Sequence, residues 1–494
     1  MDTFKTFIFH SYVFLPAKGE IQLNYSLDGH VKFTEKIILP HVGFVAYDPD
    51  ELERALFMLH LIGGISYYKT CLPKQMEIRS GILSKRETKF WNTVYENGLG
   101  EFFYQNKIDF TDLINFPSAT KPLLSVEEQL RIVEKNNARM SKLSGEQGTN
   151  DKPINEPTNQ QILVPIGGGK DSMVTIELLK KAGFDPVLFR MGSHPFIDKL
   201  AEIAKLPMLT AERHLSPTLF DLNAKGALNG HVPITAYLSA VTVVLSILYG
   251  FESVVMSNER SANEGNVWYL GKDINHQWSK GLEFEHMFQH YLETTVKTQV
   301  QYFSLLRPLS ELAIAKLFST YPQYFEHVTS CNTNWKYLKE NFEKSWPASQ
   351  SADTDKAENT QTSTDSKKSP KRGGWCGKCP KCAFVFVLLA AYLPKDTLVT
   401  MFGKNLFDDE TLIPLYRQLL DLEGFKPFEC VGTPEETASA FILAHERGGW
   451  EQTPVMKMAL EETGLPADVH ALIEQELTPS DDHAIPQKYE SAIL

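Results

Sequence analysis

The segment from Ile162 to Ser172, with the sequence ILVPIGGGKDS, constrains the fold of this chain more than any other stretch. Its apolar start indicates a buried parallel strand, and three glycines then turn the chain. Met173 to Lys181 continues as an amphipathic helix that ends at Gly183. A strand, a glycine turn and a helix in this order direct free backbone N–H groups, and the positive end of the helix dipole, at an anion. The segment therefore predicts a phosphate-binding site.

The residues after the glycines indicate which kind of phosphate site this is. A Walker A loop has four residues between its glycines and then Gly-Lys-Ser/Thr, whereas here Asp171 follows Lys170. An aspartate beside phosphates needs a metal ion between them, so Asp171 predicts bound Mg²⁺. The string resembles the Ser-Gly-Gly-x-Asp-Ser loop of ATP pyrophosphatases such as GMP, NAD and asparagine synthetases, which cut ATP between the α and β phosphates. Gly167 stands where that family usually has serine, so one donor to pyrophosphate is missing.

The composition excludes several other classes of protein. With 494 residues, 43% of them hydrophobic, the chain can fill the cores of two or three domains. The longest apolar stretch, Ile234 to Tyr249, is shorter than the roughly 20 residues of a membrane span, and Phe4 to Leu15 indicates a strand and not a signal peptide. The net charge of −12 disfavours a nucleic acid as main partner. Six cysteines, three of them clustered, do not resemble a secreted disulfide pattern, so we expect a cytoplasmic protein, of unspecified oligomeric state.

Changes in composition and in the predicted elements divide the chain into five parts. They are an N-terminal α+β domain (1–135), a polar linker (136–160), an α/β domain (161–344), a disordered insertion rich in Ser, Thr, Asp and Lys (345–374), and a cysteine-containing C-terminal region (375–494). In the first part, strand-like runs flank an Asp28-Gly29 hairpin signal, and helical patterns follow at 49–62 and 85–96.

The α/β domain determines the predicted fold class. Strands alternate there with helices; the strands lie near 162–166, 187–191, 207–212 and 253–257, and the helices near 173–182, 195–205 and 233–249. This alternation predicts right-handed βαβ units on a central parallel sheet, with ligands at the carboxyl ends of the strands. With the glycine loop it indicates an α/β fold of the adenine-nucleotide alpha-hydrolase, or PP-loop ATP pyrophosphatase, type.

Three polar segments of this domain are candidate binding sites. Ser257 to Asn266 follows the last of these strands; in it Glu259 is a candidate second Mg²⁺ ligand and Arg260 a candidate clamp for a carboxylate or phosphate. The alternative for this loop is a solvated surface ion pair. One of the other two segments, Asn229 to Pro233, opens the long apolar helix, and the other runs from Asn275 to Lys280. Their candidate substrate contacts are Asn229, His231, Asn275 and His276. Each of these residues alone fits an ordinary turn or surface position equally well, and the clustering is what indicates a site.

Cys376, Cys379 and Cys382 are spaced three residues apart. Three thiolates close together bind a soft or borderline cation, and zinc needs a fourth ligand. Cys331 is the best candidate, because mainly the predicted insertion separates it from the others. The alternatives to a structural zinc ion are reduced, packed thiols and an iron–sulfur cluster.

Eight strings occur together over most of the chain. They are Gly63 to Lys69, Asn97 to Phe102, Pro165 to Ser172, Leu228 to Pro233, Ser257 to Ser261, Asn275 to Lys280, Cys376 to Cys382 and Lys426 to Cys430. This set resembles the bacterial UDP-N-acetylmuramoyl-L-alanyl-L-glutamate epimerase family, which works in an alternative peptidoglycan route. The resemblance leaves out only the linker, the insertion and the tail, and it implies that glycine at position 167 is tolerated.

The resemblance implies an ATP- and Mg²⁺-dependent inversion of the terminal L-glutamate to D-glutamate, with release of AMP and pyrophosphate. Adenylation removes the charge of the carboxylate and creates an electron sink, so a side-chain base can take the α-proton. In this scheme the pyrophosphate and its metal are bound by Gly167, Gly168, Gly169, Lys170, Asp171 and Ser172. The candidate catalytic residues, with the bases unassigned, are Asp171, Glu259, His231, Lys280 and Cys430. The N-terminal domain is expected to help hold the UDP-sugar end.

Two other functions are compatible with the same residues. One is another PP-loop enzyme that adenylates a carboxylate or carbonyl for amidation or thiolation, such as a deazaguanine-nitrile synthase. Amidation needs an ammonia source, for which no glutaminase motif is evident, and the acidic charge disfavours a tRNA thiolase. The other is a non-catalytic nucleotide sensor, which gives no role to Asp171 or to the polar loops.

Overall fold

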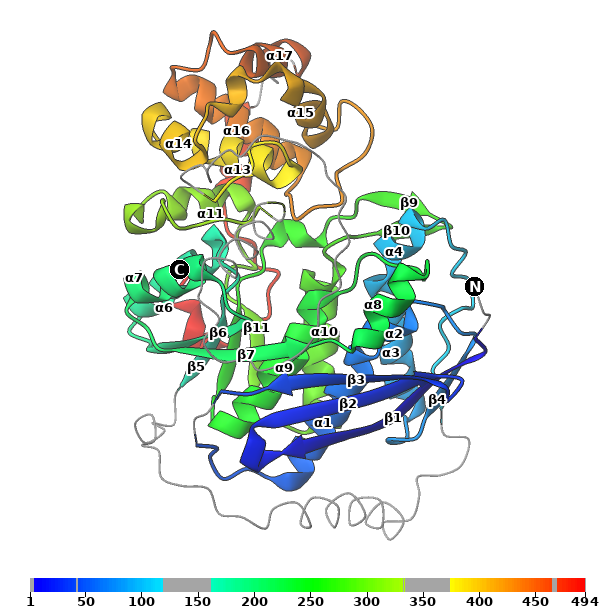
Figure 1. Ribbon diagram of the computed structural model, residues 1–494. Helices are drawn as coiled ribbons and strands as arrows, with labels where there is room; N and C mark the ends of the chain where they lie inside the picture. The colour runs from blue at the N-terminus through cyan, green and yellow to red at the C-terminus, as the bar shows by residue number, and fades with distance from the viewer. Residues whose placement is uncertain are drawn as a thin grey trace, which may run out of the picture.

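A nine-stranded sheet forms the centre of the computed structural model, which describes residues 4–40, 43–118, 161–331, 333, 374–463 and 469–493 (Figure 1). The predicted linker at 136–160, and nearly all of the predicted insertion at 345–374, lie outside the described residues. In spatial order the strands are β11 (Gln301–Ser304), β8 (Ser253–Met256), β5 (Ile162–Pro165), β6 (Pro186–Met191), β7 (Met208–His214), β3 (Val31–Ile38), β2 (Glu20–Leu27), β1 (Thr6–Leu15) and β4 (Gln75–Ile78).

The five strands from β11 to β7 pair in parallel, which confirms the predicted α/β class with a central parallel sheet. β5 lies in the middle, with β6 on one side and β8 on the other. After β5 the chain therefore builds one side of the sheet with β6 and β7, and it later builds the other side with β8 and β11. The loops that follow β5 and β8 consequently lead away from each other. Ligands of open α/β sheets bind at such a point, outside the carboxyl ends of the strands. The more specific PP-loop type stays a prediction.

The N-terminal strands continue the same sheet. β1, β2 and β3 form an antiparallel meander, and the predicted turn between β2 and β3 is confirmed, with positive φ angles of 49° at Asp28 and 73° at Gly29. β3 then pairs antiparallel with β7, where Ile37 lies opposite Arg213. The first and third predicted parts thus share one sheet.

Helices cover both faces of the sheet. Successive side chains of β5 point to opposite faces and therefore pack in two different cores. Ile162 and Val164 pack on one face, and Leu163 packs on the other. The first face is covered by α6 (Lys170–Lys181), α7 (Pro195–Ala204) and α11 (Glu311–Phe318). The second face is covered by α1 (Pro49–Gly63), α9 (Ile234–Tyr249) and α10 (Leu282–Tyr291).

The C-terminal region is a group of helices that packs mainly on α11, away from the sheet, while its last helix returns to the sheet, where Tyr489 contacts Phe303 of β11 (Figure 1). It contains α13 (Pro380–Ala390), α14 (Lys395–Phe402), α15 (Ile413–Leu419), α16 (Pro434–Arg447), α17 (Pro454–Thr463), α18 (Val469–Leu477) and α19 (Gln487–Glu490). The elements that remain are α2 (Ile65–Tyr68), α3 (Lys85–Gly98), α4 (Gly100–Gln105), α8 (Pro217–Ala224) and the ribbon of β9 (Val267–Tyr269) and β10 (Lys272–Ile274). Among the described helices, none is long and apolar enough to cross a membrane.

Candidate active site

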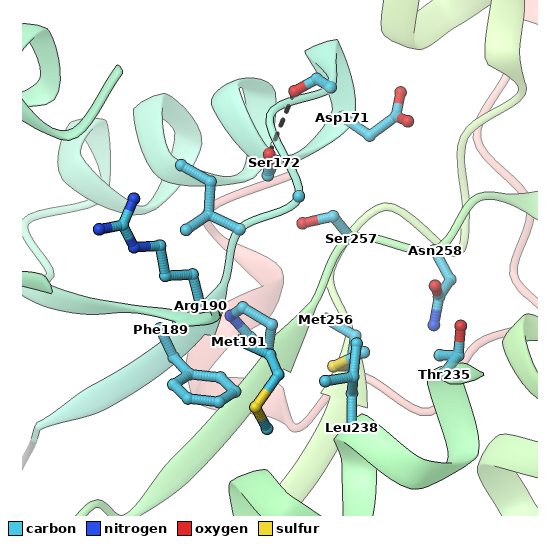
Figure 2. Close-up of a pocket in the computed structure, with 14 residues that line it drawn as sticks. Asp171, Ser172, Phe189, Arg190, Met191, Thr235, Leu238, Met256, Ser257 and Asn258 are labelled. Atoms are coloured by element: carbon cyan, nitrogen blue, oxygen red, sulfur yellow. Dashed lines mark hydrogen bonds between the residues drawn. The ribbon is translucent and has the colours of Figure 1, made fainter. Parts of the chain in front are cut away.

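The glycine loop joins β5 to α6 at the carboxyl edge of the parallel strands (Figure 2). Gly168 has a φ of 84°, a conformation that favours glycine, and Gly169 is the N-cap of α6. The helix begins at Lys170 and not at Met173 as predicted, so Asp171 and Ser172 lie in its first turn. The free N–H groups of that turn therefore lie beside the glycines, as a phosphate site requires.

An open cavity of about 210 Å³ lies over the ends of β5, β6 and β8 (Figure 2). The glycine loop, Asp171 and Ser172 line one part of it. The apolar part is lined by Phe189, Met191, Leu238 and Met256. The hydroxyl oxygen of Ser257 is buried at the same place without a hydrogen-bond partner among the described residues. An apolar pocket with a spare hydroxyl beside a phosphate-type loop fits a nucleotide.

Three carboxylates meet beside the loop, on Asp171, Glu259 and Glu311, with oxygens within 4.8 Å of one another. Glu259 and Glu311 are buried, whereas Asp171 lines the cavity. The structure thus brings the two predicted Mg²⁺ ligands together. Glu311, the first residue of α11, was not predicted, because a glutamate at the start of a helix is favourable in any protein and does not by itself indicate a site. Carboxylates this close to one another are stabilised by a cation.

Two buried lysines compensate the charge of these carboxylates. Lys170 donates to both Asp171 and Glu311, and Lys381 Nζ lies 3.4 Å from Glu311 Oε1. Burial lowers the pKa of Lys170, but Asp171 and Glu311 outweigh burial and raise it. Burial raises the pKa of Glu311, but Lys170 and Lys381 outweigh burial and lower it. Lys170, predicted to neutralise phosphate charge, therefore already has partners within the protein.

A second cavity shares Gly167 and Asp171 with the first, and Cys430 lines it. Its other lining residues are Lys280, Ser330, Cys331, Lys381 and Glu429. Cys430 Sγ lies 3.2 Å from Lys280 Nζ, and the His276 side chain lies close enough to interact with the thiol electrostatically. Burial raises the pKa of this thiol, but Lys280, His276 and Lys381 outweigh burial and lower it to about 6. This lowered pKa favours the thiolate form of Cys430 at neutral pH.

Glu101 connects two predicted substrate contacts, His231 and His276. Its Oε2 lies 2.5 Å from His276 Nδ1 and 3.1 Å from His231 Nδ1. Burial and then the neighbouring His276 lower the pKa of His231 to about 4. Burial also lowers the pKa of His276, but Cys430 and Glu101 outweigh burial and raise it to about 9. Glu101 lies in one of the eight strings, yet its role was not predicted.

The other predicted contacts lie further from the glycine loop or already have partners. Asn229 Oδ1 accepts from Lys69 Nζ at 3.0 Å, and Lys69 is a buried residue that sequence reasoning missed. Arg260 forms an ion pair with Glu476 of the C-terminal region at 2.8 Å. Asn275 uses both ends of its amide for backbone contacts. The roles predicted for these three residues in substrate binding stay predictions.

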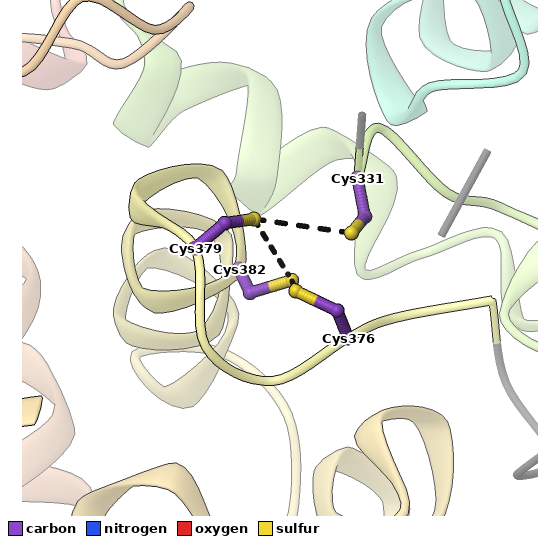
Figure 3. A group of neighbouring side chains, drawn as sticks. All are labelled: Cys331, Cys376, Cys379 and Cys382. Atoms are coloured by element: carbon purple, nitrogen blue, oxygen red, sulfur yellow. Dashed lines mark hydrogen bonds between the residues drawn. The ribbon is translucent and has the colours of Figure 1, made fainter. Parts of the chain in front are cut away.

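The four cysteines predicted to lie together form one cluster (Figure 3). Their Sγ atoms lie within 4.8 Å of one another, and three separations are 3.8 Å for Cys331–Cys379, 3.6 Å for Cys376–Cys382 and 3.5 Å for Cys379–Cys382. None of the four forms a disulfide bond. A tetrahedral zinc site with Zn–S bonds of about 2.3 Å places its sulfurs about 3.8 Å apart. The cluster therefore has the dimensions of a four-cysteine zinc site.

Comparison with known proteins gives consistent matches along the chain. A family model described as MurL N-terminal domain matches residues 1–305, and one described as MurL C-terminal domain matches residues 361–473. Three curated relatives are each named UDP-N-acetyl-alpha-D-muramoyl-L-alanyl-L-glutamate epimerase. The Micromonospora sp. protein is 36% identical over 99% of this chain and 97% of its own length. The Xanthomonas oryzae pv. oryzae protein is 35% identical over 95% of this chain and 92% of its own length. The Salinispora tropica protein is 36% identical over 99% of this chain and 95% of its own length.

Proposed function

The chain belongs to the MurL family, and on that premise we propose that it inverts the terminal L-glutamate of UDP-N-acetylmuramoyl-L-alanyl-L-glutamate to D-glutamate, using ATP and Mg²⁺. AMP and pyrophosphate are the other products, and the reaction serves peptidoglycan precursor synthesis in the cytoplasm. The observation that best supports adenylation is the junction of two cavities at Gly167 and Asp171. A pocket suited to a nucleotide lies on one side of this junction, and a pocket with a buried thiolate lies on the other.

The first step is adenylation of the substrate. An oxygen of the glutamate α-carboxylate attacks the α-phosphorus of ATP, and pyrophosphate leaves. The backbone N–H groups at Gly168 and Gly169 bind the phosphates at the start of α6. Asp171, Glu259 and Glu311 are the residues that would hold Mg²⁺, which compensates the charge that develops on the leaving pyrophosphate.

The second step is proton transfer at Cα. The adenylated carboxyl group carries no negative charge and accepts the electron pair of the broken C–H bond. Cys430 is the candidate base that fits best, because it is a thiolate in the second cavity. Burial lowers the pKa of Lys280, but Cys430 and Glu259 outweigh burial and raise it, so Lys280 is protonated. His231 pairs with Glu101. Reprotonation on the opposite face inverts Cα, and water then hydrolyses the adenylate to release AMP.

The test uses the protein with the UDP-muramoyl dipeptide, ATP and Mg²⁺ in deuterated water. We expect AMP, pyrophosphate, D-glutamate after acid hydrolysis, and deuterium at its Cα. Pyrophosphate without deuterium at Cα would leave adenylation standing but rule out the epimerase. Absence of ATP turnover with any carboxylate would favour the nucleotide sensor. Cys430→Ala should keep ATP–pyrophosphate exchange and lower deuterium incorporation by about 10²-fold or more, the usual range for loss of a general base.

We also propose that the cysteine cluster holds a structural zinc ion. Cys331 follows α11, whereas the other three cysteines lie around the start of α13. Thr329 N donates to the carbonyl oxygen of Gly168 at 2.9 Å, so a metal bound by Cys331 would also support the glycine loop. Elemental analysis should find about one zinc per chain, and Cys379→Ser should lose both the zinc and several degrees of thermal stability. Iron in its place, or metal-free protein of unchanged stability, would overturn this proposal.

A further inference from the structure

A line of polar side chains runs from the second cavity into the N-terminal part of the chain. His276 lies close enough to Cys430 to favour its thiolate, and His276 Nδ1 is hydrogen-bonded to Glu101 Oε2 at 2.5 Å. The same oxygen lies 3.1 Å from His231 Nδ1. Cys430 belongs to the C-terminal region, His276 to the loop after β10, and Glu101 to α4. The function proposed above uses only the thiolate at one end of this line.

We propose that Glu101 and His276 are positioning residues, which act through Cys430 by fixing its sulfur in the second cavity and keeping it in the thiolate form. This inference rests on the proposed function, because it assigns a reason for the thiolate that the function requires. A thiolate paired with an imidazolium, which a third group orients, is a general way to activate a cysteine. The bond from Nδ1 to Glu101 favours one orientation of the His276 ring.

The other charged groups around the thiolate set the size of the expected effect. They are Lys280 at 3.2 Å, Lys381, which donates to the Cys430 backbone oxygen, and Lys426 and Glu259 at longer range, with Glu429 adjacent in the chain. The lysines favour the thiolate without help from Glu101. Loss of Glu101 should therefore remove part of the stabilisation and leave the remainder. His231 is the second partner of Glu101. Lys69, at the C-terminal end of α2, is a further positive charge near His231.

Glu101→Gln tests the inference, because glutamine has the same size and no charge. Without the carboxylate, His276 loses its proton at lower pH, and the Cys430 thiol should titrate roughly one pH unit or more higher. The measurement is the rate of iodoacetamide labelling at Cys430 against pH, followed by mass spectrometry of its peptide in the full chain without substrates. The half-maximal rate should lie near pH 6 in the wild type. Glu96→Gln is the matched control, since Glu96 forms a half-exposed ion pair with Lys272.

The labelling profile does not depend on epimerase activity, so the inference and the proposed function can fail separately. An unshifted profile in folded Glu101→Gln would overturn the inference, because the lysines alone would then keep the thiolate. The deuterium assay supplies the second readout. In Glu101→Gln the exchange rate should fall by about threefold or more at pH 6.5, and most of it should return at pH 8.5, where the thiol ionises unaided. A residue with only a structural role would lower the rate equally at both pH values, and that result would also overturn the inference.

Discussion

Two buried clusters of charge lie along the same sheet, and they differ in how their hydrogen bonds are completed. The first surrounds Glu35 on β3. Arg213 of β7 holds this carboxylate with two nitrogens at 2.9 and 3.0 Å. The hydroxyls of Tyr67 and Tyr237 donate to it at 2.9 and 2.7 Å. Its charge and its hydrogen bonds are therefore completed within the protein.

The second cluster surrounds the glycine loop and is built differently. Three carboxylates lie within 4.8 Å of one another, and Asp171 lies where two cavities join. Like charges at this distance repel one another, so lysines alone do not make this arrangement as favourable as a single bidentate pair. The cluster around Glu35 joins the N-terminal strands to the parallel strands, whereas the cluster at Asp171 keeps three carboxylates together beside two cavities. Substitutions in the two clusters should consequently affect different properties.

Asp171→Asn should give the largest effect on activity. An amide is a weak ligand for Mg²⁺, so ATP–pyrophosphate exchange should fall by about 10³-fold or more. The side chain is 23% exposed, and an amide relieves repulsion among the carboxylates. The free energy of unfolding should therefore change by less than about 1 kcal/mol. Urea unfolding and the exchange assay measure the two quantities, and retained exchange would refute a metal role for Asp171.

The matched change in the other cluster is Glu35→Gln. It leaves Arg213 buried without a counter-charge, and removal of one partner of a buried pair costs about 3–5 kcal/mol. The loss should appear as a lower midpoint of urea unfolding, while exchange per folded molecule at low temperature stays near the wild-type value. If folded Glu35→Gln lost exchange as well, the cluster around Glu35 would also influence the site, and the contrast between the clusters would fail.

Local sequence patterns were sufficient to predict the helices and strands of the fold but not to predict how these elements pack together. The Asp28-Gly29 turn and the glycine loop depend on backbone conformations that neighbouring residues determine. The pairing of β3 with β7 is different, because a strand's periodicity does not specify its partner. The sequence pattern therefore gives no sign that β3 and β7 share a sheet.

The same distinction applies to the site. Asp171 and Glu259 follow strands that end at one edge of the sheet, so their meeting could be predicted. Glu311 begins a helix, where a glutamate is favourable in any protein, and only the packing of α11 brings it to the other two carboxylates. Lys381 and Glu101 reach the site from helices that also depend on tertiary packing. Residue type and spacing cannot identify such positions.

Gly167→Ser should give the smallest effect, at the position where this chain departs from ATP pyrophosphatases. The φ of Gly167 is not positive, and a Cβ there would meet no other described atom within 4 Å. A serine should therefore fit without strain and leave the free energy of unfolding unchanged. Its hydroxyl can donate one hydrogen bond to pyrophosphate, worth about 0.5–1.5 kcal/mol, so the KM for ATP should fall by about two- to tenfold. Exchange kinetics over a range of ATP concentrations measure this change.

Gly168→Ser is the control for that prediction, because the φ of 84° at Gly168 strains any residue with a Cβ, and its exchange rate should fall. A loss of exchange in Gly167→Ser of the same size would show that the space beside Gly167 is used by something larger than a hydroxyl. Gly167 lines both cavities, so that occupant would be the substrate carboxyl group on its way to the α-phosphorus. Glycine at position 167 would then be required, because the substrate carboxyl group needs the space beside it. A serine side chain, as in the ATP pyrophosphatases, would block the approach of that carboxyl group to the α-phosphorus.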